Sequence, residues 1–286
     1  MDIQWYPGHM VKSKRLLKEN LKLVQAVIEL LDARVPMSSK NPEFDEILKD
    51  KFRICVLNKS DLAEKAATRE WVKYYQNLNL RCIAVNSLSG EGIPKVIRTL
   101  SSIQNSRKNA RIRRMVLPVR VMVIGIPNVG KSAFINKLVG KATAKTGDKP
   151  GVTRGKQWIR IRKGIELLDT PGVLWPKLTG EGVGFKLAAL NAIGENAYDR
   201  VELVLKLLEY LQENYPKQLS ERYDLMVDDY TPEQLLQEIG LKKGCLQKGN
   251  EVDLHSTAAI VLKEFRTGKI TRLTLDGLPE NEKRRN

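Results

Sequence analysis

A short glycine-containing segment, GIPNVGKS at residues 125–132, has the spacing of a phosphate-binding loop. It matches G-x-x-x-x-G-K-[ST], in which the glycines let backbone N–H groups approach phosphate oxygens closely. The helix that we expect from Lys131 to Val139 adds the positive end of its dipole. We predict that Lys131 reaches the β and γ phosphates of a nucleotide and that the Ser132 hydroxyl binds Mg²⁺.

A second element, NKSD at residues 58–61, indicates which base is bound. The Asp61 carboxylate can accept hydrogen bonds from N1 and N2 of guanine, whereas adenine has no hydrogen on N1 and no 2-amino group. A site built on such polar pairing discriminates by ~10⁴ or more. The segment NSLSG at 86–90 takes the place of the element that meets the base through backbone N–H groups. The residues that we expect around the base are Asn58, Lys59, Ser60, Asp61, Asn86 and Ser87.

Two further segments have the spacing of elements that respond to the γ phosphate. DTPG at residues 169–172 follows the apolar run Ile165–Leu168, and KPGVT ends at Thr153. We expect Asp169 to support Mg²⁺ through water, Gly172 to sense the γ phosphate and Thr153 to contact both groups. The remaining phosphate contacts are expected from the loop and first helical turn, at Asn128, Val129, Gly130 and Ala133.

The order of these elements along the chain is unusual for a GTPase. The phosphate loop ordinarily precedes the guanine element, but here residues 58–61 come before residues 125–132. If the sequence is read circularly, the usual order is restored. The pattern therefore predicts a circularly permuted GTPase domain in which a basic connector, at about 104–117, joins the former ends. Because the termini of a domain commonly lie close together, they can be joined in such a permutation with little change to the fold.

Hydrophobic patterning predicts the elements that position these loops. Apolar runs at 24–33, 52–58, 80–86 and 118–124 alternate with helical segments, which predicts an α/β domain whose mostly parallel sheet is covered by helices on both faces. Amphipathic segments at 200–215 and 231–240 predict a small all-helical domain instead. We place the permuted GTPase domain at 1–175 and the helical domain at 176–286.

The net positive charge of the chain favours a polyanionic partner, and nucleic acid is the leading candidate. The 286-residue chain has 49 Lys and Arg against 33 Asp and Glu, a net charge of +16. Residues 1–175 hold 33 basic and 15 acidic residues, a net of +18, whereas the remainder holds 16 and 18. The sequence shows neither a bilayer-spanning run nor a secretory signal, and its three cysteines have no metal-binding spacing. We expect a cytoplasmic protein with no membrane partner.

The motif order, the opening WYPGHM, the segment LLDARVPMSSKNP and the helical end together resemble the bacterial ribosome biogenesis GTPase A family. The resemblance extends over essentially the whole chain. It implies a GTPase that binds the large ribosomal subunit late in assembly, contacts rRNA and ribosomal proteins, and uses its C-terminal domain as an RNA-binding module. Residues 252–271 are similar to the helix and turn of that module. We expect a monomer in solution that binds GTP and GDP.

Hydrolysis needs a group that orients the attacking water, and the residue after DTPG is Val173, which cannot do so. The resembled family uses the His of its PGH motif for this role, which here is His9. The alternative is that the N-terminal segment only packs against the domain through Trp5 and Tyr6. Asn128 resembles the Asn of potassium-activated GTPases, whose carbonyl helps to hold K⁺ near the phosphates and so stabilises transition-state charge.

Two other functions remain open at this point. One is a GTP-dependent RNA-binding switch with negligible turnover, which Val173 would permit. The other is a GTPase partner in tRNA modification. Such a partner would show the unpermuted motif order and a partner-binding Cys element, and the sequence has neither.

Guanine specificity gives a direct prediction. Asp61→Asn replaces a carboxylate acceptor with an amide that clashes with the base donors, so preference should shift from GTP towards xanthine nucleotides. A nucleotide competition assay measures this change, and an unaltered GTP affinity would remove Asp61 from the base site.

Overall fold

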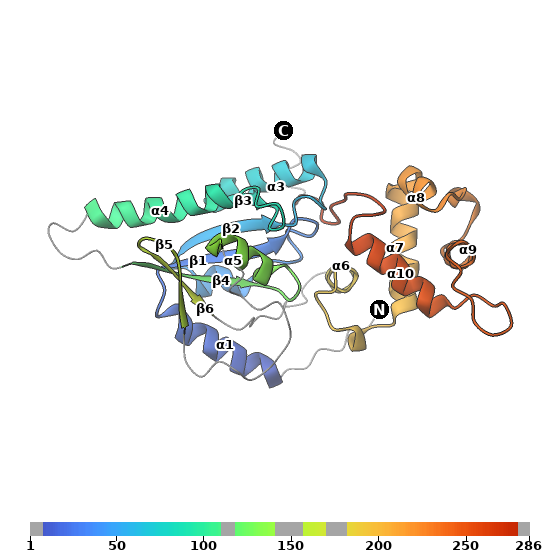
Figure 1. Cartoon of the computed structure of the whole chain (residues 1–286), viewed down its shortest axis with the longest axis horizontal. Coiled ribbons are helices and arrows are strands. Elements are labelled where there is room, and N and C mark those ends of the chain that lie inside the picture. The colour runs from blue at the N-terminus through green and yellow to red at the C-terminus, as the bar shows by residue number, and fades with distance from the viewer. Residues whose placement is uncertain (1–7, 110–117, 141–156, 170–181, 280–286) are drawn as a thin grey trace. The chain divides into compact units, whose positions relative to one another are not determined.

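The computed structural model describes residues 8–109, 118–140, 157–169 and 182–279. These residues form two compact units. The sheet unit contains the described residues up to 169 together with 274–279, and the helical unit contains 182–273. Figure 1 traces the helices and strands of each unit.

The sheet unit is built on six strands in the order β3-β2-β1-β4-β6-β5. All neighbouring pairs are parallel except β5 and β6, which form an antiparallel pair. The mostly parallel sheet predicted from the sequence is therefore confirmed. Its strands are β1 Ala26–Asp32, β2 Phe52–Asn58, β3 Arg81–Val85, β4 Val119–Gly125, β5 Gln157–Arg162 and β6 Ile165–Asp169.

Helices cover both faces of this sheet. They are α1 Gly8–Leu21, α2 Glu43–Ile47, α3 Lys65–Asn77, α4 Ile93–Asn109 and α5 Lys131–Val139. The side chains of α1, α2 and α3 pack in clusters that include Val27 and Leu31, which lie on one face of β1 because they are four residues apart in a strand. Ile28 and Leu30 point to the other face and are fully buried too. Helices α4 and α5 contact the strands β3 to β6.

Two segments differ from the boundaries that the sequence suggested. Helix α4 continues to Asn109, so the first residues of the expected connector at 104–117 are helical. The segment 274–279 packs with the sheet unit, although the expected boundary at residue 176 assigns the whole C-terminal end to the helical domain. Leu278 contacts the cluster around Trp71 there. This return of the chain depends on contacts between residues more than two hundred positions apart, which local sequence patterns do not encode.

The helical unit contains α6 Val183–Ala189, α7 Arg200–Asn214, α8 Pro216–Tyr223, α9 Pro232–Lys243 and α10 Leu254–Arg266, with short 3₁₀ turns η1 Glu195–Ala197 and η2 Val227–Asp229. Helices α7, α9 and α10 contact one another. Side chains cap the N-terminal ends of these three helices, at Asp199, Thr231 and Asp253. In the ranges that the structure describes, no helix has the length and apolar composition needed to cross a bilayer.

Candidate nucleotide-binding site

The loops singled out in the sequence meet at one edge of the sheet, because the carboxyl ends of parallel strands lie together. Residues 58–61 follow β2, residues 86–90 follow β3 and the phosphate loop follows β4. Strand β1 lies between β2 and β4, and its register pairs Asp32 with Asn58 and Leu30 with Gly125. The guanine element and the phosphate loop are therefore neighbours in space on either side of the end of β1.

The phosphate loop has the backbone conformation that its glycines and asparagine permit. Asn128 and Gly130 have φ angles of 55° and 95°, in the left-handed region. A Cβ atom on Gly130 would lie 2.5 Å from the side-chain nitrogen of Asn58, so only glycine fits. Gly130 caps the N-terminus of α5, whose first backbone N–H groups have no partner within the helix. This arrangement can bind an anion.

Lys131 is held against this loop. Its Nζ donates to the carbonyl oxygens of Gly125 at 2.9 Å and Ile126 at 2.7 Å. Burial lowers the pKa of Lys131 to about 8. A phosphate beside the amine would favour its charged form, so Lys131 would take up a proton when a phosphate ligand binds.

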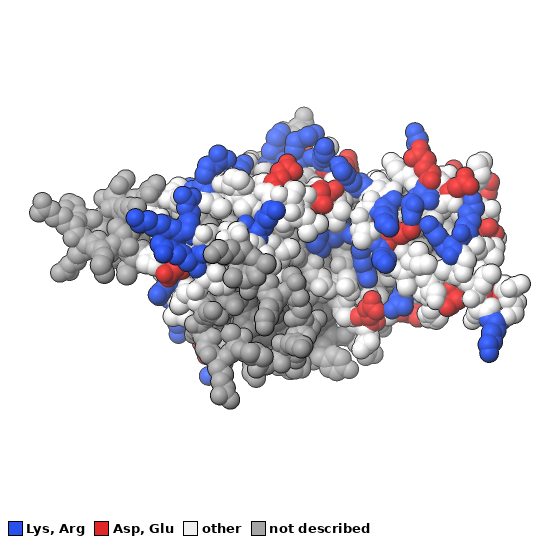
Figure 2. Space-filling view, viewed as in Figure 1, with Lys and Arg blue, Asp and Glu red and all other residues white. Residues whose placement is uncertain are grey.

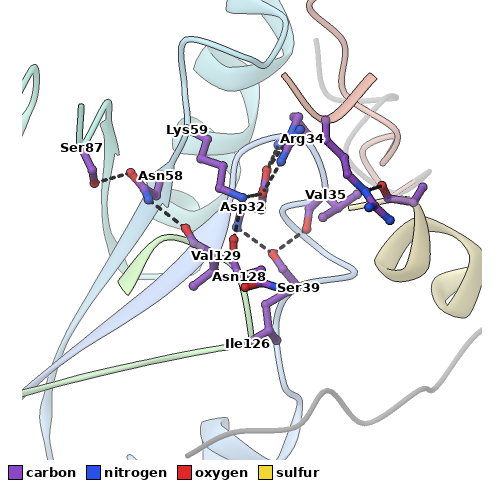
Figure 3. Close-up of polar contacts among 12 residues, drawn as sticks. Asp32, Arg34, Val35, Ser39, Asn58, Lys59, Ser87, Ile126, Asn128 and Val129 are labelled. Carbon is purple, nitrogen blue, oxygen red and sulfur yellow. Dashed lines mark hydrogen bonds and ion pairs between the residues drawn. The ribbon is translucent and has the colours of Figure 1, made fainter. Parts of the chain in front are cut away.

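Asn58 joins three loops. Its Nδ2 donates to the carbonyl of Val129 at 2.8 Å, and its Oδ1 accepts from the Ser87 hydroxyl at 2.6 Å (Figure 3). Asn58 is buried, so both polar ends of its amide are satisfied away from water. Three of the residues that the sequence proposed for nucleotide contact are thus brought together, with Asn58 fixing the phosphate loop relative to the loop after β3.

Lys59 makes a second connection to the phosphate loop. It has a φ of 58°, and its Nζ donates to the carbonyl oxygen of Asn128 at 2.6 Å. The same ammonium group lies 3.0 Å from a carboxylate oxygen of Asp32 (Figure 3). The Lys59 ammonium group of the guanine element therefore lies between the end of β1 and the phosphate loop.

Asp32 and Arg34 are residues of this site that we did not identify from their chemistry in the sequence. Arg34 donates from Nε and Nη2 to the two oxygens of Asp32, at 2.9 Å each, and both side chains are buried. Burial alone would raise the pKa of Asp32, but Arg34 and Lys59 overcome it and hold that pKa well below its usual value. The available signal was a carboxylate at the last residue of the buried strand β1 and a guanidinium two residues later.

The other base-side residues lie on the loops after β2 and β3. Ser60 donates its backbone N–H to the carbonyl of Val85 at 3.2 Å, and Asp61 follows it, half-buried. Asn86 accepts hydrogen bonds at Oδ1 from the backbone of Leu88 at 2.8 Å and of the next residue. These bonds to the side chain of Asn86 hold the loop after β3 in its turn conformation.

The residues that we expect to bind or support Mg²⁺ are only partly described. Ser132 is exposed in the first turn of α5, and Asp169 ends β6 at the same sheet edge. Thr153, Gly172 and Val173 lie outside the described residues, as do the side chains of His9 and Asp169. Among the described residues no group of three acidic, His or Cys side chains could hold a metal alone. A single hydroxyl with supporting carboxylate fits Mg²⁺ held mainly by nucleotide phosphates and water.

Comparisons with known proteins agree with this geometry. A family model described as "50S ribosome-binding GTPase" matches residues 120–238, a range that begins in β4 and leaves the NKSD element on its N-terminal side. Ribosome biogenesis GTPase A from Bacillus pumilus is 43% identical over 96% of this chain and 99% of its own length. The protein of that name from Thermotoga maritima is 30% identical over 96% of this chain and 94% of its own length.

Solved structures show the same architecture. The GDP-bound structure of YlqF superposes with a TM-score of 0.68 and 25% identity, over 92% of this chain and 99% of that one. GNP-bound YlqF from T. maritima superposes with a TM-score of 0.67 and 26% identity, over 93% and 97% of the two chains. The circularly permuted fold predicted from the motif order is thereby confirmed.

The pKa of Lys131 predicts how GDP binding depends on pH. Its pKa is about 8 without nucleotide and higher beside a phosphate, so binding takes up a proton between the two pKa values. GDP affinity should be highest below pH 8 and should fall about tenfold between pH 7 and 9. Titration calorimetry in buffers of different ionisation enthalpy measures both effects. Lys131→Met is the control, since its weaker binding should lack this pH dependence; a flat wild-type profile would contradict the prediction.

Proposed function

Because the chain belongs to the ribosome biogenesis GTPase A family, we propose that it binds the large ribosomal subunit and its rRNA and promotes a late step of that subunit's assembly. It is a GTP hydrolase by its family and its GTPase fold, and it forms GDP and phosphate. The observation that carries the proposal is the match to the family described as 50S ribosome-binding GTPase. In this proposal hydrolysis occurs when the protein is docked on the subunit.

A basic surface on the sheet unit supports an RNA partner. Arg81 and Arg162 lie on either side of α4, with guanidinium nitrogens 3.4 and 3.3 Å from the hydroxyls of Ser102 and Ser101. Figure 2 shows Lys and Arg side chains over the part of the unit that carries α4 and β5. We call the exposed basic residues of this region the α4 surface: Arg81, Lys95, Arg98, Arg162 and Lys163. Positive charge gathered in this way suits contacts to a phosphate backbone.

In the helical unit only some of the basic residues are available to a partner. Residues 241–272 hold seven basic and three acidic residues. Lys243 lies 3.3 Å from Glu264, Lys242 pairs with Asp224, and Arg266 donates to two backbone carbonyls at the end of α6. The other four basic residues of this segment, Lys248, Lys263, Lys269 and Arg272, are exposed. We propose that these four contact rRNA.

In this proposal different residues of the chain bind the phosphates, bind Mg²⁺, hold K⁺ and orient the attacking water. Lys131 and the N-terminus of α5 bind the phosphates, and Ser132 binds Mg²⁺ with support from Thr153 and Asp169. Potassium would take the side-chain oxygen of Asn128, because the backbone carbonyl of that residue already faces the Lys59 ammonium group. His9, which belongs to α1, would orient the attacking water that Val173 cannot.

Binding through phosphate contacts predicts a specific response to loss of charge on the α4 surface. Lys95→Gln combined with Arg98→Gln should weaken binding to isolated large subunits and lower the slope of log affinity against log salt by about 1.5. Sedimentation with subunits at several salt concentrations measures the slope.

The matched control is Lys206→Gln combined with Lys217→Gln, which removes the same charge from i,i+4 pairs with glutamates in the helical unit. This control should bind as the wild type does. Equal loss in both double variants, or equal wild-type binding to small subunits, would contradict the proposed surface.

His9→Ala tests how hydrolysis is coupled to docking. If His9 orients the water, the variant should bind GTP and large subunits normally but lose about 10²-fold in subunit-stimulated turnover. His255→Ala, which removes the other His of the chain, is the matched control and should keep full stimulation. Stimulated turnover near the wild-type rate in His9→Ala would leave that residue with a packing role.

A further inference from the structure

The segment 274–279 reaches the sheet unit and is anchored there by a buried carboxylate. Asp276 is 6% exposed, and it accepts hydrogen bonds from the backbone N–H groups of Met37 at 2.9 Å and Ser38 at 2.7 Å. It also accepts one from the Ser38 hydroxyl at 2.7 Å. The backbone of the segment adds a bond from Leu275 N–H to the Arg34 carbonyl at 2.7 Å. The segment 274–279 therefore holds the loop that follows β1.

This loop, residues 33–41, connects Asp276 with the nucleotide site. The Ser39 hydroxyl accepts from the backbone N–H of Asp32 at 3.1 Å and donates to the Val35 carbonyl at 2.6 Å. The hydroxyl of Tyr75 donates to the Pro36 carbonyl at 2.9 Å. Because most of the loop is buried and its backbone is bonded from several sides, its conformation has few alternatives.

The loop in turn sets the position of Lys59. The Arg34 guanidinium donates two hydrogen bonds to the Asp32 carboxylate, the backbone N–H of Arg34 donates a third, and Asp32 lies 3.0 Å from the Lys59 ammonium group. Lys59 donates to the carbonyl of Asn128 in the phosphate loop. Three polar contacts, Arg34 to Asp32, Asp32 to Lys59 and Lys59 to Asn128, thus connect the loop 33–41 with the phosphate loop.

We propose that Asp276 is a positioning residue of the guanine-nucleotide site, which holds the loop 33–41 in the conformation in which Arg34 and Asp32 fix Lys59. The helical unit ends at Leu273, so the same covalent chain passes directly from that unit into this anchor. Displacement of the segment would loosen the loop and lower nucleotide affinity. The inference rests on the nucleotide site assigned above and is independent of any ribosomal partner.

Two substitutions separate the hydrogen bonds of Asp276 from its charge. Asp276→Ala removes the acceptors of two backbone N–H groups and leaves them unsatisfied in a buried place. Asp276→Asn keeps one oxygen for the N–H groups of Met37 and Ser38, and its amide nitrogen can donate to the Ser38 hydroxyl. The alanine variant should therefore weaken GDP binding by about 2- to 30-fold, and the asparagine variant should restore most of it.

The experiment is a titration of the full chain with fluorescent GDP at fixed Mg²⁺, combined with a double-mutant cycle. If Asp276 acts through Asp32, Asp276→Ala should add little to the loss caused by Asp32→Asn. Val72→Ala is the control for lowered stability, because Val72 packs against the same cluster as Trp71 but the substitution leaves the polar contacts of the loop in place. It should lower the melting temperature and leave GDP affinity within twofold.

Exchange of backbone amides in the wild type gives a test that needs no variant. Coupling is reciprocal, so saturating GDP should slow hydrogen exchange at Met37, Ser38 and Leu275. Wild-type affinity in Asp276→Ala, additive losses in the cycle, equal loss in Val72→Ala, or unchanged exchange would each overturn the proposal. Failure of the site assignment itself is distinguished by Asp61→Asn, which would then keep its GTP affinity.

Discussion

The ammonium group of Lys59 lies between the Asp32 carboxylate at the end of β1 and the Asn128 carbonyl in the phosphate loop. Asp32 is buried, and a buried carboxylate is costly unless cations pair with it and hydrogen bonds satisfy its oxygens. Arg34 and Lys59 meet that requirement together. Ion pairing at the carboxyl end of β1 therefore positions Lys59 before a nucleotide binds, and the hydrogen bond from Lys59 to Asn128 holds the phosphate loop beside it.

This arrangement explains why a permuted chain can keep the site of an ordinary GTPase. The loops to which we assign nucleotide binding follow β2, β3 and β4, and they meet because parallel strands end at one edge of the sheet. Strand order in space decides which loops are neighbours, whereas the order along the chain decides only where the connections run. The permutation leaves β1 between the guanine element and the phosphate loop, so Asp32 can bridge them.

Basic residues serve two purposes in this protein. Arg34, Lys59 and Lys131 are turned inward, where they balance a carboxylate or bond to loop carbonyls. In the helical unit Glu264 takes Arg222 and Lys243 as partners, which leaves a smaller exposed set than the charge count suggests. A net charge therefore indicates a polyanionic partner, but it does not say which cations are available to that partner.

The sequence by itself determined the chemistry of the nucleotide loops and much of the fold, because each depends on a local pattern. The bounds predicted for β2 and α5 agree with the structure, since apolar periodicity and glycine spacing act over a few residues. Only the tertiary structure decided that Asp32 would pair with Lys59 and that Asp276 would anchor the loop after β1. Those contacts join residues far apart in the chain. They form because buried charged and polar groups need hydrogen-bonding or ionic partners, and the strand order decides which groups lie close enough to provide them.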